Sequence, residues 1–204
     1  MKGLILKDIY TLIKQTRIIL LLVIFFSITP GYSGASFAVV YGAMLPITAL
    51  AYDERCKWNT LAAMMPYSAR DMVLSKYLLG YITVGSATLL TVTAQTFIAL
   101  FRNSDSAAND ILSILFVALT GTVVLAVNLP IVFKMGVEKG RYIFMFLIAV
   151  FTIAVTAFGS RLGEIILNIN ISPWGFGICL LLAAVVLNVV SILISVKIFS
   201  KKAE

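Results

Sequence analysis

Long apolar segments separated by short polar stretches occupy most of the chain. A helix of about 20 apolar residues crosses the roughly 30 Å hydrocarbon core of a bilayer. Of the 204 residues, 61% are hydrophobic and 12% are charged, whereas a soluble domain has about 25% charged residues. We therefore expect an all-α, polytopic membrane protein with a single transmembrane domain over residues 1–204. The expected spans, about six in number, are residues 16–32, 35–51, 77–101, 111–133, 142–160 and 174–196.

The segments outside the spans differ in composition. Ile5, Ile9 and Leu12 recur at helical spacing with lysines between them, which predicts an amphipathic helix over residues 2–16 lying along the membrane surface. Further along, we expect a tight turn at 30–34, polar loops at 52–76 and 102–110, a short basic loop at 134–141, a semi-polar segment at the outer interface at 161–173 and a tail from residue 197.

Basic residues are concentrated on one side of this topology. The positive-inside rule places loops rich in Lys and Arg in the cytoplasm. The basic residues of that side are Lys2, Lys7, Lys14, Arg17, Arg55, Lys57, Arg70, Lys76, Lys134, Lys139, Arg141, Lys197, Lys201 and Lys202, against Arg102 and Arg161 on the other side. We therefore expect both termini in the cytoplasm. The net charge of +7 is then a topology signal and not a sign of nucleic-acid binding, and Cys56 is a reduced thiol on the opposite side from Cys179.

The middle of each predicted span lacks Asp, Glu, Lys, Arg and His, and the chain has no histidine at all. A charge at the bilayer centre costs about 3 kcal/mol or more, so membrane proteins keep one mainly for function. The absence argues against an ion-coupled carrier and against a metal- or aspartate-dependent intramembrane protease. We expect no catalytic residue and no metal site in this chain.

Hydroxyl and amide side chains are present in the spans instead. Two explanations fit them: hydrogen bonds between packed helices, which contribute roughly 0.6–2 kcal/mol each, or a weakly polar lining for a translocation path. The helix-packing explanation is favoured for any single residue. The candidates for a path lining, several of which share a helical face, are Thr88, Thr91, Gln95, Asn128, Asn188 and Ser191.

The segment 52–76 is too polar to span a membrane and too apolar for a flexible linker. Trp58, Leu61, Met64 and Met65 fall at helical spacing, which predicts a short helix with one apolar face. Pro66 would end this helix, and Ser68 could cap the next one. Such a face, bordered by charges, could dock another protein or could rest on the headgroups of its own bilayer. The physical argument alone leaves these two alternatives equal.

The same segment resembles the first cytoplasmic loop of bacterial ABC transporter permeases of the type-2 class. The shared features are the acidic and basic cluster at 53–55, a Trp, a Met-Pro-x-Ser and a Ser-Lys-Tyr at 75–77. The second basic loop, with Pro130 closing the preceding span and the run 138–141 after it, is also similar to that class. Ala69 departs from the pattern, because a basic residue is common after the Ser.

The resemblance implies a permease subunit of an ATP-driven exporter, acting as a dimer with a second permease copy. The first loop would be a coupling helix seated in a separate cytosolic ATPase subunit. The residues implied in docking that subunit are Asp53, Glu54, Arg55, Trp58, Leu61, Met65, Pro66, Ser68 and Arg70, with Glu138, Lys139 and Arg141 as a second contact.

No cofactor is expected in this chain, because ATP and Mg²⁺ would be used by the partner subunit. The run 136–141 lacks the Gly-Lys-Ser/Thr ending of a phosphate loop. Mostly apolar spans suit hydrophobic or amphipathic cargo, such as a peptide, toxin or antibiotic. The alternative function is a non-transporting immunity or regulatory protein that docks a cytosolic partner.

Overall fold

The computed structural model describes residues 2–29, 32–65, 67–102, 107–150, 153 and 173–203, and they are helical almost throughout. The helices are α1 (Lys2–Gln15), α2 (Arg17–Ile28), α3 (Tyr32–Arg55), α4 (Trp58–Ala63), α5 (Ala69–Arg102), α6 (Ala107–Met135) and α8 (Pro173–Ala203). Residues 137–150 form a further helix. The described part of the chain contains no strand, so the all-α expectation is confirmed.

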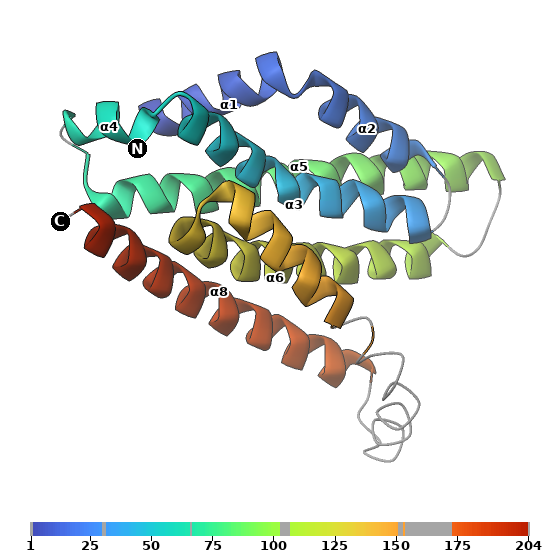
Figure 1. Ribbon diagram of the computed structural model, residues 1–204. Helices are drawn as coiled ribbons and strands as arrows, with labels where there is room; N and C mark the ends of the chain where they lie inside the picture. Colours follow the sequence, from blue (N-terminus) through green and yellow to red (C-terminus); the bar gives the residue numbers. More distant parts are fainter. Residues whose placement is uncertain are drawn as a thin grey trace.

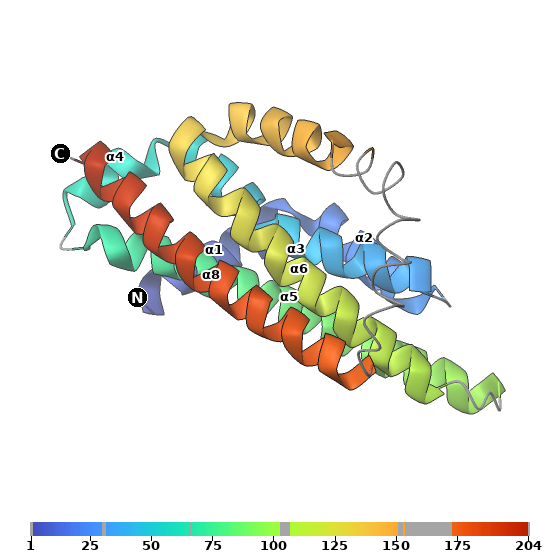
Figure 2. The same ribbon diagram turned by 90° about the horizontal axis from the view of Figure 1, so that it is seen from below.

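The long helices run side by side and form one bundle (Figure 1). Helix α5 lies inside it, in contact with α3, α6 and α8. Both views show α4 and the two ends of the chain at the same end of the bundle (Figures 1 and 2). We refer to this end as the α4 end.

Four helices of the described residues are long and apolar enough to cross a membrane: Ser36–Arg55, Ala69–Ile98, Ser113–Met135 and Leu180–Lys201. Helices α1 and α2 meet at an 82° bend, and together they pass the same test as one broken span, which raises the number to five. The described helices thus provide four to five candidate spans, and the six expected spans are not all confirmed. The predicted fifth span, 142–160, extends into residues outside the described part of the chain.

Several predicted loops are shorter in the structure than expected. Tyr32 begins α3, so residues 32–34 are helical and do not belong to a turn. Helix α5 includes Arg102 and α6 begins at Ala107, so the 102–110 loop is wrong at both of its ends. The basic loop at 134–141 is a single break at Gly136, and the tail is helical to Ala203.

The corrections at 102–110, at 134–141 and in the tail share one physical reason. Hydropathy marks only the part of a helix that needs lipid, whereas Lys, Glu, Met and Ala are good helix formers that extend helices beyond the apolar stretch. Pro130 likewise does not close its helix, because α6 continues to Met135. The predicted segment 161–173 lies outside the described residues except for Pro173, which opens α8.

The core of the bundle is formed where α3, α5 and α6 meet. Val39, Tyr77, Leu125 and Leu129 belong to one buried apolar cluster. Gly80 makes a close approach between α5 and α6 possible, since a Cβ atom at this position would lie 2.6 Å from the Leu125 side chain. Small residues that allow such close backbone contact are typical of helix packing in membranes.

Candidate functional site

Helix α4 presents an apolar surface at its end of the bundle. Lys57 adopts a left-handed conformation with φ of 50°, which redirects the chain between α3 and α4. Ala62 is fully buried and anchors the helix, while Leu61, Met64 and Met65 are 51%, 81% and 42% exposed. We call these three side chains the α4 apolar face. The sequence predicts all three as exposed, but the helix ends at Ala63, earlier than expected, so Met64 and Met65 lie in the turn that follows it.

Trp58 is placed differently from the other residues of that predicted face. The Nζ atom of Lys7, in α1, lies 4.2 Å from the centroid of the Trp58 ring. Such a cation–π contact contributes roughly 0.5–2 kcal/mol, depending on how far it is desolvated. Trp58 therefore attaches α4 to α1 and is only partly exposed.

Beneath α4 lies a group of four buried or half-buried charges, which we call the ion cluster: Lys7, Asp8, Asp53 and Lys76. The Nζ atom of Lys76 lies 2.7 Å from Asp8 Oδ2 and 2.5 Å from Asp53 Oδ2. The Nζ atom of Lys7 lies 2.6 Å from Asp53 Oδ1 and 3.0 Å from Asp8 Oδ1. The two lysines and two carboxylates balance in charge, and they join α1, α3 and α5.

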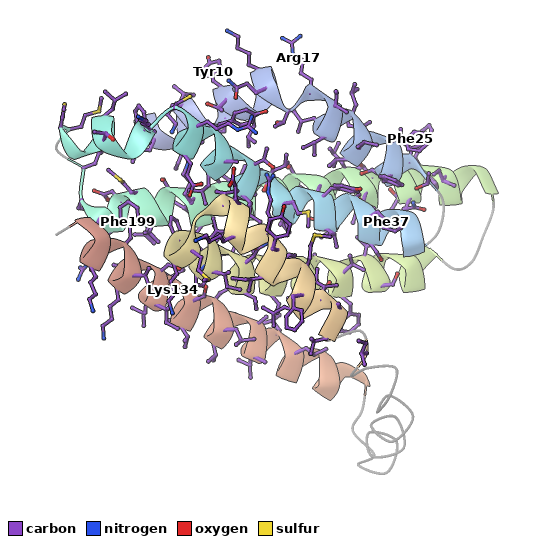
Figure 3. The ribbon with its side chains drawn as sticks, viewed as in Figure 1. Tyr10, Arg17, Phe25, Phe37, Lys134 and Phe199 are labelled. Carbon is purple, nitrogen blue, oxygen red and sulfur yellow. The ribbon has the colours of Figure 1, made fainter. Side chains whose placement is uncertain are left out.

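The ion cluster is well removed from solvent, because the side chains of Asp8, Asp53 and Lys76 are less than a tenth exposed. A cavity of about 20 Å³ adjoins it, between Trp58, Phe133 and Phe199. Figure 3 shows Phe199 at this end of the bundle, on the last turns of α8. Charges buried in this way must be paired, since an isolated one costs several kcal/mol.

The sequence did not reveal this cluster. Asp8 was not singled out, Lys7 and Lys76 were interpreted as topology signals, with Lys76 also part of the Ser-Lys-Tyr motif, and Asp53 was interpreted as a docking residue. The signal was present in α1, where Asp8 lies one helical turn from both Leu4 and Leu12, the two residues of that face that are buried. An acidic residue in the middle of an apolar face indicates a buried ion pair.

Glu54 connects the two loops that the resemblance singles out. Its Oε1 and Oε2 atoms both accept a hydrogen bond from the backbone N–H of Val137, each at 3.1 Å. Val137 follows Gly136, whose φ of +83° is favourable for glycine and strained for other residues. The carboxylate thus caps the first turn of the helix over 137–150 and ties it to the end of α3.

The remaining docking candidates have different surroundings. Ser68 is confirmed as a helix cap, because its Oγ accepts a hydrogen bond from the N–H of Asp71 at 3.1 Å and donates one to the Asp71 carboxylate at 2.9 Å. Asp53 belongs to the ion cluster and is buried. Pro66 lies outside the described residues. The exposed candidates are Arg55, Arg70, Glu138, Lys139 and Arg141.

Polar residues of α5 bind α2. The hydroxyls of Thr91 and Ser27 lie 3.2 Å apart, and Thr91 is fully buried. The Nε2 atom of Gln95 donates a hydrogen bond of 2.7 Å to the carbonyl of Thr29. Thr88 bonds only to carbonyls of its own helix.

A second set of polar contacts joins α8 to α5 and α6. Tyr81 donates a hydrogen bond of 2.8 Å to Asn188 Oδ1, and the hydroxyl of Tyr77 lies 2.6 Å from that of Ser191. Ser191 also donates to the carbonyl of Ala126. That carbonyl lacks the usual N–H donor four residues later in its helix, because that residue is Pro130.

These bonds give Thr91, Gln95, Asn188 and Ser191 a role in helix packing within one chain. Asn128 is 3% exposed, and its Oδ1 atom has no hydrogen-bond partner among the described residues. None of the candidate path residues lines a cavity described in this bundle.

No curated protein and no solved structure matches the chain. A model of the family described as ABC-2 family transporter protein matches residues 3–200, almost the whole chain. The resemblance of the two loops to type-2 permeases is therefore confirmed, and with it the assignment to a membrane component of transport that is not itself catalytic. The chain forms a helical bundle with several membrane-length helices, and the family model matches nearly all of its length. The chain therefore belongs to the ABC-2 transporter family.

Proposed function

We propose that this chain is the membrane-spanning permease subunit of an ATP-driven exporter, powered by a separate cytosolic ATPase subunit that binds α4. The observation that carries the proposal is the α4 apolar face. Leu61 on α4 and Met64 and Met65 in the turn directly after it are all exposed, and Arg55 and Arg70 flank this segment in the sequence. Exposed apolar residues rimmed by charge are typical of a protein docking site.

The surroundings of α4 support a coupling role. In the sequence, α4 connects α3 to α5. Trp58 attaches α4 to α1, and Glu54 attaches the end of α3 to the helix over 137–150. A displacement of α4 by the ATPase would therefore reach several membrane helices at once. Arg55, Arg70, Glu138, Lys139 and Arg141 are exposed and available as orienting charges. Asp53, in contrast, would act by holding α3 to α5.

The proposed topology has six spans: α2, α3, α5, α6, the helix that begins at residue 137, and α8. Helix α1 would lie along the inner surface of a bacterial plasma membrane, in keeping with its 82° bend from α2. The α4 end, with both termini, would face the cytoplasm. Tyr10 of α1 and Arg17 at the start of α2 project away from the other helices (Figure 3), which leaves this side of the bend free to contact lipid headgroups.

Two permease copies would form the transport path between them, and the chain itself would bind neither ATP nor Mg²⁺. Large exposed apolar side chains cover α8 and the helix over 137–150, which leaves surface for lipid and for a second copy. The cargo class that suits such apolar spans is hydrophobic or amphipathic. Among the candidate path residues, Asn128 is buried and its Oδ1 atom has no hydrogen-bond partner in the described part of the chain.

The test is assembly with the ATPase subunit. A photo-crosslinking residue at Leu61 should capture a soluble subunit with a Walker A motif in native membranes, and purified permease should stimulate its ATP hydrolysis. Leu61→Ala with Met65→Ala should reduce co-purification at least tenfold while leaving membrane insertion intact. Trp58 is kept, because its contact with Lys7 supports the fold.

The matched control is Leu89→Ala with Leu100→Ala, two exposed apolar residues of α5 distant from α4. This variant should assemble normally. Normal co-purification of the Leu61 and Met65 variant would refute the docking role. Capture of a cytosolic partner without nucleotide hydrolysis would favour the alternative, a regulatory or immunity protein.

A further inference from the structure

A groove between α5 and α8 lies at the α4 end, apart from the α4 apolar face and the ion cluster. Its volume is about 730 Å³. The first turns of α5 form one wall, with Arg70 and Leu74, and the last turns of α8 form the other, with Leu193, Val196, Lys197 and Ser200. This size is typical of a site that binds a small molecule or part of a lipid.

The chemistry of the groove is divided between its walls and its rim. Leu74, Leu193 and Val196 provide apolar walls, while Arg70 and Lys197 bring two positive charges. Both basic side chains are exposed, and neither forms a salt bridge with another described residue. The nearest acid in the sequence, Asp71, is engaged by the Ser68 hydroxyl at 2.9 Å.

The groove also lies at the ends of two candidate membrane spans, where apolar residues are followed by polar ones. The candidate span of α5 begins at Ala69 and that of α8 ends at Lys201. A ligand in the groove would therefore meet lipid along Leu74 and Leu193 and headgroups at Arg70 and Lys197. Only an amphiphile with an anionic head satisfies both parts of the groove.

We propose that this groove binds an anionic phospholipid, with its phosphate between Arg70 and Lys197 and an acyl chain along the apolar walls. Arginine and lysine both donate charge-assisted hydrogen bonds to phosphate oxygens. A zwitterionic lipid binds more weakly, because its ammonium group meets the same two cations. The site depends on the chain lying in a bilayer and does not depend on α4 binding an ATPase.

The experiment is native mass spectrometry of the full purified chain in detergent, titrated with phosphatidylglycerol or phosphatidylcholine. Wild type should retain phosphatidylglycerol preferentially. Arg70→Ala with Lys197→Ala should weaken its binding about 30-fold, since each basic residue near an anionic surface contributes about 1 kcal/mol and 1.4 kcal/mol is a factor of ten. Binding of phosphatidylcholine should not change.

The control is Lys14→Ala with Arg17→Ala, which removes the same charges from exposed positions at the α1–α2 bend. It should change phosphatidylglycerol binding less than threefold. Equal losses in the two variants would overturn the site. If inorganic phosphate displaced the lipid and chloride at the same ionic strength did not, the groove would be a site for a free anion and not for a phospholipid. If the Arg70 and Lys197 variant changed its oligomeric state but still bound phosphatidylglycerol, the groove would be a contact between two copies of the chain and not a lipid site.

Discussion

Lys76 is held between two carboxylates that come from other helices. Its Nζ atom lies within 2.7 Å of both Asp8 and Asp53, and its side chain is 8% exposed. Lys76→Met would leave two buried carboxylates with Lys7 as their common partner. Because removal of one member of a buried ion pair leaves an uncompensated charge, we expect a loss of about 3–5 kcal/mol in the free energy of unfolding.

Asp8→Asn should cost less than Lys76→Met, since the surplus positive charge it leaves can fall on Lys7, whose side chain is 26% exposed. The surplus negative charge left by Lys76→Met falls on two carboxylates that are less than a tenth exposed. Lys201→Met, at an exposed position of α8, should change stability by less than about 0.5 kcal/mol. Unfolding in mixtures of detergent and SDS, followed by circular dichroism, measures all three variants. Equal stability of the Lys76 and Lys201 variants would show that the ion cluster contributes nothing to the fold.

The sequence predicted residue roles that depend on neighbours in the chain. The cap at Ser68 was predicted correctly, because it bonds the N–H of Asp71, only three residues away. The pairing of Lys76 with Asp8 joins residues 68 positions apart, which no local pattern specifies. Trp58 was assigned to the exposed face because helical spacing ignores the left-handed turn at Lys57, which sets the direction of α4.

At the scale of helices, a hydrogen bond between α8 and α6 compensates for a proline. Pro130 has no N–H, so the carbonyl of Ala126 accepts from the Ser191 hydroxyl instead. Ser191→Ala should therefore cost about 1–2 kcal/mol, the usual penalty for an unsatisfied buried acceptor. Tyr77 would keep its contact with Ser195 at 2.8 Å.

A double-mutant cycle tests this explanation. Pro130→Ala restores an N–H that can bond to the Ala126 carbonyl, so Ser191→Ala should cost less in that background. Ser86→Ala serves as the control, because its hydroxyl bonds only to the Thr83 carbonyl of its own helix. The same cost for Ser191→Ala with and without Pro130 would contradict the proposed compensation.

Helix identity followed from hydropathy, whereas helix ends did not. The amphipathic pattern placed a separate first helix correctly, and the structure adds the bend after Gln15. The predicted ends were wrong where polar residues continue a helix past the apolar stretch, as α8 does to Ala203. The break at Gly136 could have been anticipated, because glycine is the residue that most readily adopts positive φ.

For the whole molecule, the α4 end gathers features that are far apart in the sequence. Helix α4, the ion cluster and the Gly136 break lie together, and both termini are at the same end (Figures 1 and 2). Most of the basic residues outside the spans belong to these segments. The positive-inside rule then predicts the proposed orientation, with this end in the cytoplasm.

Cysteine labelling tests that orientation in intact cells. Cys56 is exposed beside α4, so with Cys179→Ser it should resist a membrane-impermeant maleimide until the cells are permeabilised. In a chain without Cys56 and Cys179, Asn109→Cys, in the first turns of α6, should be labelled in intact cells. Cys56 lies in the turn between α3 and α4, at the α4 end, whereas α6 begins at the opposite end of the bundle (Figure 1), so each position is the control for the other. Labelling of Cys56 from outside would place the α4 apolar face beyond the reach of any cytosolic ATPase.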